Sequence, residues 1–297
     1  KKIYMKKPPA SSNLLVMTGQ FSTPHPYVVR RTETEYWHHR SPWMEDLLKT
    51  TVSFFETTLG GAYAARILSA SGSGACESYV ANMVNEGDEV WVAGKEFKEL
   101  TMRYGASVKV IGNELPDGQA QVVFLEHVAP DGSMIDLFSL VKKIRDRCPD
   151  ALIITDLSSS FGADIIDFSS LDSDGCVIVP ERALGGIPGI SVLAFRESVR
   201  EHIRKTRETA ETVPYSFDIL KYDKAWEKHS TPYSPNISSS VALAASIELI
   251  DRNGGFEKHL ERQTLQARIV RNGMRALGAT CTEGGTNAFT VFSLPCD

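Results

Sequence analysis

The stretch that decides the fold is ALIITDLSSSFG, residues 151–162. Five apolar or β-branched residues lead without interruption to Asp156, and three serines and Gly162 follow. A continuous apolar run of this length, ended by polar residues, is typical of a buried strand in a parallel sheet. A carboxylate at the carboxyl end of such a strand points into the crevice where α/β sheets bind ligands. We therefore expect Asp156 to meet a ligand, with an N-cap on the next element as the structural alternative.

Short β-branched runs alternate with amphipathic stretches on both sides of this strand, which is typical of a doubly wound α/β domain. The predicted strands are residues 65–69, 89–93, 107–111, 121–126, 151–155, 176–179 and 190–195. The predicted helices between them are residues 75–85, 96–104 and 139–147. The sequence therefore predicts a mainly parallel sheet with helices as crossovers.

The pattern changes after Pro235. Helices are predicted over residues 238–251 and 256–277, followed by a strand over residues 287–294. This succession is typical of the start of a smaller α+β domain. Only a small part of such a domain is present up to Asp297. We divide the chain into an N-terminal tail (1–12), a large domain (13–237) and a partial, truncated small domain (238–297).

Composition excludes several classes of protein. The 297 residues are 42% hydrophobic and 23% charged, with a net charge of −5 and a pI near 5.9. This charge attracts neither nucleic acid nor anionic lipid, and no apolar run approaches the ~18 residues that span a bilayer. The five scattered cysteines form no CxxC pair, so we expect no metal site, and they fit a reducing, cytoplasmic compartment.

A turn rich in glycine and serine, SGSGACE at residues 71–77, lies between a predicted strand and a predicted helix. Free backbone N–H groups and the positive end of the helix dipole make such a turn an anion site, for which phosphate is the natural occupant. Spacing excludes a GxGxxG dinucleotide fingerprint and a GxSxG nucleophile elbow. An ordinary strand-to-helix connection remains the alternative.

The order of these motifs carries a resemblance to a known family. After the phosphate turn and the Asp156 strand comes DGCVIVPERALGGIPG at residues 174–189, a strand and glycine-rich loop ending in Pro-Gly. The chain thereby resembles the class V aminotransferases, which are pyridoxal-phosphate enzymes of fold type I. Its motifs are most similar in sequence to those of the branch that transaminates 2-aminoethylphosphonate. Further matches are LLVMTG at 14–19, His39-Arg40, Ser230-Thr231-Pro232 and RNGMRALG at 271–278.

This resemblance implies a cofactor, pyridoxal phosphate or pyridoxamine phosphate, and a place for it. Ser73, Gly74 and Ala75 would hold its phosphate, and Asp156 would pair with the pyridinium nitrogen so that the ring acts as an electron sink. Thr231 would reach the phosphate of the neighbouring subunit. A homodimer with its sites at the interface follows from the same resemblance.

One departure from the family concerns its chemistry. The family reads Ser-x-Lys before the glycine-rich loop, and that lysine forms the imine with the cofactor, whereas this chain reads Pro180-Glu181-Arg182. A guanidinium, whose pKa is above ~12, neither forms an imine nor acts as a base at neutral pH. Arg182 therefore occupies the catalytic lysine position without the lysine's chemistry.

Other positions depart as well. The loop before Phe97 is about four residues shorter than in the family and lacks the aromatic residue that stacks on the pyridine, and for Phe97 itself we favour a core role. The family's hydroxyl-rich turn is VAPDG at residues 128–132, next to His127. The chain also ends before the C-terminal arginine that family members use to bind a substrate carboxylate.

Whether the chain is an enzyme thus stays open at this point. One hypothesis is a transaminase-type pocket acting on small amino acids or aminophosphonates. A second is a lysine-less homologue that binds a phosphorylated ligand or a partner chain. A third is a protein that uses preformed pyridoxamine phosphate, for which Glu181 and His127 are the candidate bases. In each case the cofactor, if bound, is held non-covalently.

Overall fold

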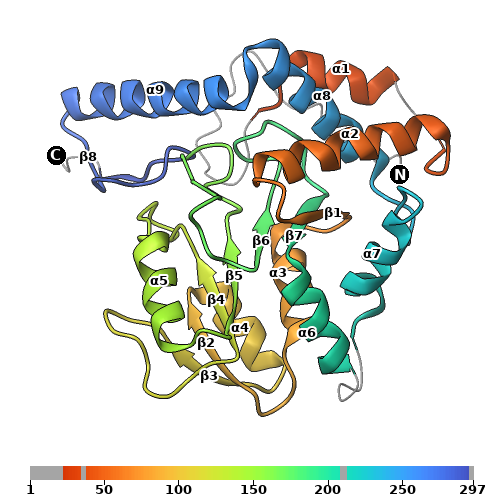
Figure 1. Ribbon diagram of the computed structural model, residues 1–297. Coiled ribbons are helices and arrows are strands. Elements are labelled where there is room, and N and C mark those ends of the chain that lie inside the picture. Colours follow the sequence, from red (N-terminus) through yellow and green to blue (C-terminus); the bar gives the residue numbers. More distant parts are fainter. Residues whose placement is uncertain (1–22, 35–37, 208–212, 294–297) are drawn as a thin grey trace, which may run out of the picture.

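The computed structural model describes residues 23–34, 38–207 and 213–293 (Figure 1). The LLVMTG segment therefore lies outside the described residues, as does the N-terminal tail. The strands of the central sheet are β1 (Ala64–Leu68), β2 (Glu89–Ala93), β3 (Ser107–Val110), β4 (Val122–Glu126), β5 (Leu152–Asp156), β6 (Gly175–Ile178) and β7 (Ser191–Phe195). All the strand predictions between residues 65 and 195 are confirmed to within one residue at each end.

The sheet is mainly parallel, as predicted. Its strand order is β1-β7-β6-β5-β4-β2-β3, and β7 is antiparallel to both of its neighbours while the other pairs are parallel. The crossover helices cover both faces of the sheet, so side chains on both sides of each strand are buried. The strands are therefore continuous apolar runs in the sequence. In β4, for example, Val123 and Leu125 pack into one core and Val122 and Phe124 into the other.

Helices cover both faces of the sheet (Figure 1). One core joins the sheet to α2, α5 and α8, and the other joins it to α3, α6 and α7. The helices are α1 (Pro26–Thr34), α2 (Pro42–Thr58), α3 (Gly72–Met83), α4 (Lys95–Arg103), α5 (Leu137–Arg147), α6 (Glu197–Arg207), α7 (Ile219–Trp226), α8 (Ile237–Arg252) and α9 (Gly255–Ala276), with a 3-10 turn at Tyr215–Phe217. No helix in these described ranges is long and apolar enough to cross a membrane.

The C-terminal part differs from its prediction in one element. A short antiparallel pair, β8 (Thr280–Cys281) and β9 (Phe292–Ser293), follows α9, which runs across the top of the molecule in Figure 1. The strand predicted over residues 287–294 is therefore wrong for most of its described length. The Asn287 N–H donates to Asp164 Oδ1 at 2.9 Å and is thus taken out of any strand ladder.

The division of the chain at residues 237 and 238 stays a prediction. Helix α8, which begins at this boundary, contributes Val241, Leu243 and Ile247 to the core that also contains residues of α2. The start of the predicted small domain therefore packs directly against the large one.

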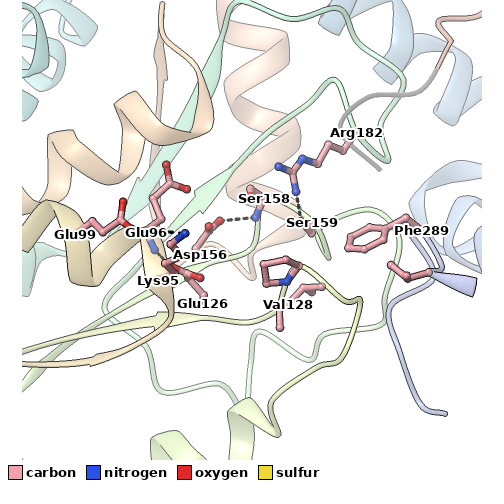
Figure 2. A pocket seen from close by; sticks show the side chains of 13 residues that line it. Lys95, Glu96, Glu99, Glu126, Val128, Asp156, Ser158, Ser159, Arg182 and Phe289 are labelled. Carbon is pink, nitrogen blue, oxygen red and sulfur yellow. Dashed lines mark hydrogen bonds and ion pairs between the residues drawn. The ribbon is translucent and has the colours of Figure 1, made fainter. Parts of the chain in front are cut away.

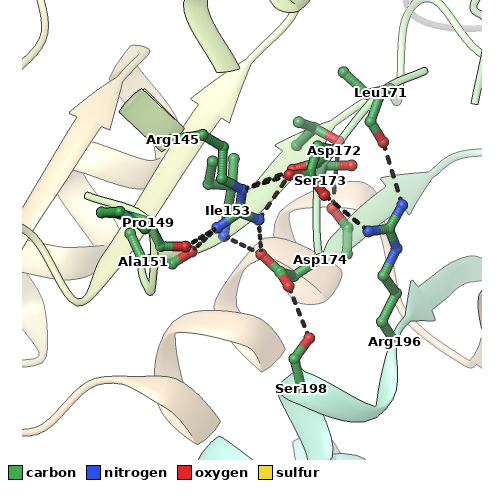
Figure 3. Close-up of polar contacts among 12 residues, drawn as sticks. Arg145, Pro149, Ala151, Ile153, Leu171, Asp172, Ser173, Asp174, Arg196 and Ser198 are labelled. Carbon is green, nitrogen blue, oxygen red and sulfur yellow. Dashed lines mark hydrogen bonds and ion pairs between the residues drawn. The ribbon is translucent and has the colours of Figure 1, made fainter. Parts of the chain in front are cut away.

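A polar network ties the elements together at the amino edge of the sheet (Figure 3). Asp174, just before β6, accepts hydrogen bonds from Arg145 Nη2 at 2.6 Å, from the Ile153 N–H at 2.9 Å and from Ser198 Oγ at 2.7 Å. Arg145 of α5 also donates to the Pro149 carbonyl. The network fixes α5, β5, β6 and α6 at the end opposite to Asp156.

Candidate functional site

A cavity of about 530 Å³ opens at the carboxyl ends of the parallel strands (Figure 2). Glu126 ends β4 and Asp156 ends β5, and both line it. Arg182 enters from the loop after β6, while Phe289 and Val291 come from the C-terminal segment. Residues more than 160 positions apart thus meet at the edge where α/β sheets bind ligands.

Asp156 occupies the position predicted for it. Its Oδ1 accepts a hydrogen bond from the Ser158 N–H at 2.7 Å. Burial raises the pKa of Asp156, and the hydrogen bonds from Ser158 and the charge of Arg182 oppose that rise. The carboxylate is therefore costly to bury without a cationic partner, which agrees with the expectation that it meets a ligand.

Arg182 lies in the same cavity. Its Nη1 donates a hydrogen bond to Ser159 Oγ. In Figure 2, Ser158 and Ser159 lie between Asp156 and the guanidinium. The permanent positive charge of Arg182 thus faces the cavity from the side opposite to Asp156.

The wall beside Asp156 is acidic, which the sequence analysis missed. Glu126 pairs with Asp156 in the register of β4 and β5, and Glu96 and Glu99 of α4 line the cavity next to them. Glu126 Oε1 accepts the N–H groups of Glu96 at 2.6 Å and Phe97 at 3.1 Å, so this carboxylate binds the first turn of α4. The signal was present in the sequence, because two parallel strands each end in an acid.

Cys76 approaches the same wall. The ligand atoms of Cys76, Glu96 and Asp156 lie within 4.8 Å of one another. Burial raises the pKa of the Cys76 thiol well above its ordinary value, so the thiol is protonated at neutral pH. Acidic groups at this spacing are common without an ion, and we assign no metal here.

Two of the backbone N–H groups that were predicted to bind phosphate donate hydrogen bonds within the turn itself. Ser71 caps α3, its Oγ accepting the Gly74 N–H at 3.4 Å and its carbonyl accepting the Ala75 N–H at 3.0 Å. The amides predicted at Gly74 and Ala75 are thus engaged within the first helical turn. The N–H groups of Gly72 and Ser73 precede the first intrahelical hydrogen bond of α3. Phosphate binding by Ser73, Gly74 and Ala75 stays a prediction.

Gly72 brings the backbone close to the cavity. A Cβ added at Gly72 would lie 2.9 Å from Val179 Cγ2 and 4.0 Å from Ser158 Cβ. Since Ser158 also lines the cavity, the open end of α3 adjoins it. None of residues 71–75 is among the residues that line the cavity, so the turn lies next to the cavity without forming its wall.

Of the predicted site residues, Asp156 and Arg182 line the cavity, whereas Ser73, Gly74, Ala75, His127, Glu181 and Thr231 do not. His127 is buried, its Nδ1 is 2.8 Å from Ser160 Oγ, and burial lowers its pKa to about 4. Glu181 is also buried, and burial raises its pKa. Thr231 Oγ1 donates to the Tyr233 carbonyl at 2.6 Å. The structure thus gives neither candidate base a place at the cavity surface.

Phe97 takes the core role that the sequence favoured. It is fully buried and stacks on Phe124, with ring centroids 4.6 Å apart and an angle of 17° between the ring planes. Gly94 leads directly into α4 at Lys95. The short loop therefore presents the acids of α4 to the cavity in place of an aromatic ring.

Comparison with known proteins identifies the family. The model of the aminotransferase class-V family matches residues 38–288. The chain belongs to the class V aminotransferase family. An uncharacterized aminotransferase of Methanocaldococcus jannaschii is 24% identical over 91% of this chain and 74% of its own length. A 2-aminoethylphosphonate–pyruvate transaminase of Lysinibacillus sphaericus is 22% identical over 86% of this chain and 76% of its own.

Solved structures agree on the fold. A crystal structure of alanine–glyoxylate aminotransferase from Nostoc sp. superposes with a TM-score of 0.85 at 19% identity, over 99% of this chain and 82% of that one. Pyridoxamine–pyruvate aminotransferase from Mesorhizobium loti gives 0.80 at 20% identity, over 98% of this chain and 79% of that one. At such identities the likeness shows the fold alone, which is that of the fold-type I aminotransferases. The chain spans 54% of the length of an alanine–glyoxylate aminotransferase of Drosophila melanogaster and 76% of that of the Lysinibacillus sphaericus transaminase.

Proposed function

We propose that this chain is a lysine-less class V aminotransferase homologue that binds pyridoxal phosphate or pyridoxamine phosphate non-covalently. The observation that carries the proposal is the guanidinium of Arg182, which lies in the cavity and donates to Ser159. Arg182 stands where the resemblance places the imine-forming lysine. Since a guanidinium forms no imine, binding here has to be non-covalent.

The residues around the cavity fit such a ligand. Asp156 offers a carboxylate whose burial calls for a cationic partner, as a pyridinium N–H would be. Gly72 and Ser73 offer N–H groups at the start of α3, where the helix dipole favours a phosphate. The cavity volume of about 530 Å³ lies in the range of small-molecule sites.

When bound, the cofactor would supply an electron sink, and the chain's own residues would bind and orient it. Asp156 would hold the proton on the ring nitrogen. Arg182 would donate hydrogen bonds to an oxygen of the ligand. Phe289 and Val291 would cover the cavity on the C-terminal side and limit the access of water.

The acidic wall favours the amine of a second ligand. Glu96 and Glu99 offer carboxylates in the cavity beside Asp156, and these attract the ammonium group of a small amino acid or aminophosphonate. Turnover of such an amine by transamination requires a base. The pKa of His127 near 4 and its absence from the residues that line the cavity argue against it in that role. We therefore propose binding in place of transamination.

Two further proposals concern the surroundings of the chain. We infer a homodimer from the family resemblance of the Ser230-Thr231-Pro232 segment, and sedimentation at micromolar concentration tests it. We also infer a reducing, cytoplasmic compartment. In its support, the cysteines at 76, 148, 176 and 281 are free.

Titration of the native chain with pyridoxamine phosphate and pyridoxal phosphate, followed by intrinsic fluorescence, tests the proposed function. We expect saturable binding that Asp156→Asn weakens by roughly 10- to 100-fold, since one charged hydrogen bond is lost. Asp146→Asn, on the surface of α5, is the matched control. If neither compound binds, or if Asp156→Asn binds as tightly as the native chain, the proposal is wrong.

A further inference from the structure

The C-terminal segment 285–291 forms one wall of the cavity that Asp156 lines. Phe289 and Val291 of this segment line the cavity, and among the described residues that do so Phe289 has the only aromatic side chain. In Figure 2, Phe289 lies on the far side of Ser159 from Asp156. A ligand that pairs with Asp156 would therefore extend toward this ring.

Two glycines let the segment lie close against the turn at residues 128–132. A Cβ added at Gly285 would lie 2.8 Å from the Gly132 carbonyl oxygen, and one added at Gly132 would lie 3.4 Å from Phe289 Cε2. The Thr286 N–H donates a hydrogen bond to the same Gly132 carbonyl at 3.0 Å. Since residues 128–130 of the turn also line the cavity, the Phe289 ring packs beside this part of the cavity wall.

Asp164, in the loop after β5, holds the start of the segment. Its carboxylate accepts a hydrogen bond from Thr286 Oγ1 and another, at 2.9 Å, from the Asn287 N–H. Burial raises the pKa of Asp164, and these two donors and the charge of Arg271 oppose that rise. The buried carboxylate thus depends on hydrogen-bond donors from the C-terminal segment.

Arg271 of α9 holds the segment along its length. Its Nη2 donates to the Gly285 carbonyl at 3.0 Å and to the Thr286 carbonyl, and its Nε donates to Thr290 Oγ1 at 3.0 Å. Beyond these contacts the segment joins β9, which pairs with β8. Phe289 is therefore held between fixed points on both sides of it.

We propose that Phe289 contacts the flat face of an aromatic ring bound in the cavity, and that Arg271 and Asp164 are positioning residues that hold Phe289 there. The inference rests on the proposed function and deepens it, because that function expects a pyridine ring in this cavity. Phe97, at the start of α4, is buried in the core and is not among the residues that line the cavity. A phenyl ring on the C-terminal wall offers a planar ligand the apolar surface that α4 does not.

Hydrogen–deuterium exchange of the full chain without ligand tests the positioning. Arg271→Gln and Asp164→Asn should each raise the exchange rate of residues 286–291 at least tenfold, since hydrogen bonds to charged groups are lost. Arg271→Lys, which keeps the charge but reaches fewer acceptors, should raise it less. Arg268→Gln, an exposed arginine of α9, is the matched control and should exchange as the native chain does. Unchanged exchange in both Arg271→Gln and Asp164→Asn would overturn the inference.

Titration with pyridoxamine phosphate, followed by intrinsic fluorescence, tests the ring contact. Phe289→Ala should weaken binding by roughly 5- to 10-fold, whereas Phe289→Tyr should keep it. Phe138→Ala, on α5 and outside the cavity lining, is the matched control. Arg271→Gln should also weaken binding, and in a Phe289→Ala background it should weaken it no further, because Arg271 acts through the ring.

The outcomes separate this inference from the proposed function. If the native chain does not bind pyridoxamine phosphate, the proposed function and the ring contact fail together. If the native chain binds it and Phe289→Ala binds it as tightly, the ring contact alone is wrong. An effect of Arg271→Gln on binding that persists in the Phe289→Ala background would contradict the positioning role of Arg271.

Discussion

At the scale of single residues, burial governs the titratable groups around the cavity. Burial is the largest cause of the raised pKa of Asp156 and of Glu126, and it lowers the pKa of His127 to about 4. Each of these groups is thus shifted toward its neutral form. Hydrogen bonds from Ser158 to Asp156 and from the α4 backbone to Glu126 oppose the rise in pKa of the two acids. These hydrogen-bond donors therefore favour the charged forms of the two carboxylates.

The buried histidine makes stability depend on pH. A His pKa near 4 in the folded chain, against ~6.5 when unfolded, means that the unfolded chain binds more protons between these values. The free energy of unfolding therefore falls by up to about 3 kcal/mol as the pH drops from 6.5 to 4. Urea denaturation should show a smaller fall for His127→Gln. The exposed His38→Gln is the control, and equal slopes in all three chains would contradict this account.

At the scale of elements, the link between β4 and α4 shapes the acidic wall. Gly94 has φ 128° and precedes α4, and Glu126 at the end of β4 binds the first N–H groups of that helix. A Cβ at Gly94 would lie 2.2 Å from Glu126 Cδ. The close approach of this glycine therefore fixes both the start of α4 and the position of Glu96 in the cavity.

Gly94→Ala should strain this link. The positive φ and the displaced Glu126 together should lower the free energy of unfolding by roughly 2–3 kcal/mol, measured by urea denaturation. Gly112→Ala is the matched control, because an added Cβ there meets nothing within 4 Å. We expect the control to change stability by less than about 0.5 kcal/mol. A Gly94→Ala chain as stable as the control would show that the link is not strained.

At the scale of the whole molecule, the Asp174 network and the cavity proposed to bind the cofactor lie at opposite edges of the sheet. The Asp174 network lies at the amino edge, whereas Asp156 and Arg182 lie at the carboxyl edge. A change at one edge should therefore leave the other intact. A substitution at the amino edge should therefore lower the free energy of unfolding without changing the shape of the cavity.

Asp174→Ala should reveal this separation. Loss of the partner of Arg145, with the Ile153 N–H and Ser198 also left unpaired, should cost about 3 kcal/mol of unfolding free energy. Binding of pyridoxamine phosphate at a temperature where the variant is folded should be unchanged. Asp172→Ala, whose side chain is 60% exposed, should cost less than about 1 kcal/mol. A loss of ligand affinity in folded Asp174→Ala would contradict the separation.

The sequence predicted the sheet well, because buried parallel strands such as residues 151–155 read as unbroken apolar runs. It placed Asp156 in the cavity for the same reason. It did not show which residue of the turn caps α3, since several neighbouring Ser and Gly residues are all possible N-caps and only the structure shows that Ser71 is the cap. It missed the acidic wall, which depends on the register that pairs Glu126 with Asp156.

The absence of an imine-forming amine at position 182 is the central claim, and borohydride trapping measures it directly. The native chain incubated with pyridoxal phosphate and borohydride should show no cofactor adduct on intact mass and peptide mapping, and Lys95, which lines the cavity beside Glu99, should stay unmodified. Arg182→Lys should acquire an adduct on residue 182. An adduct on Lys95 in the native chain would contradict the claim of non-covalent binding, and a folded Arg182→Lys chain that acquires none would contradict the presence of a pyridoxal cavity.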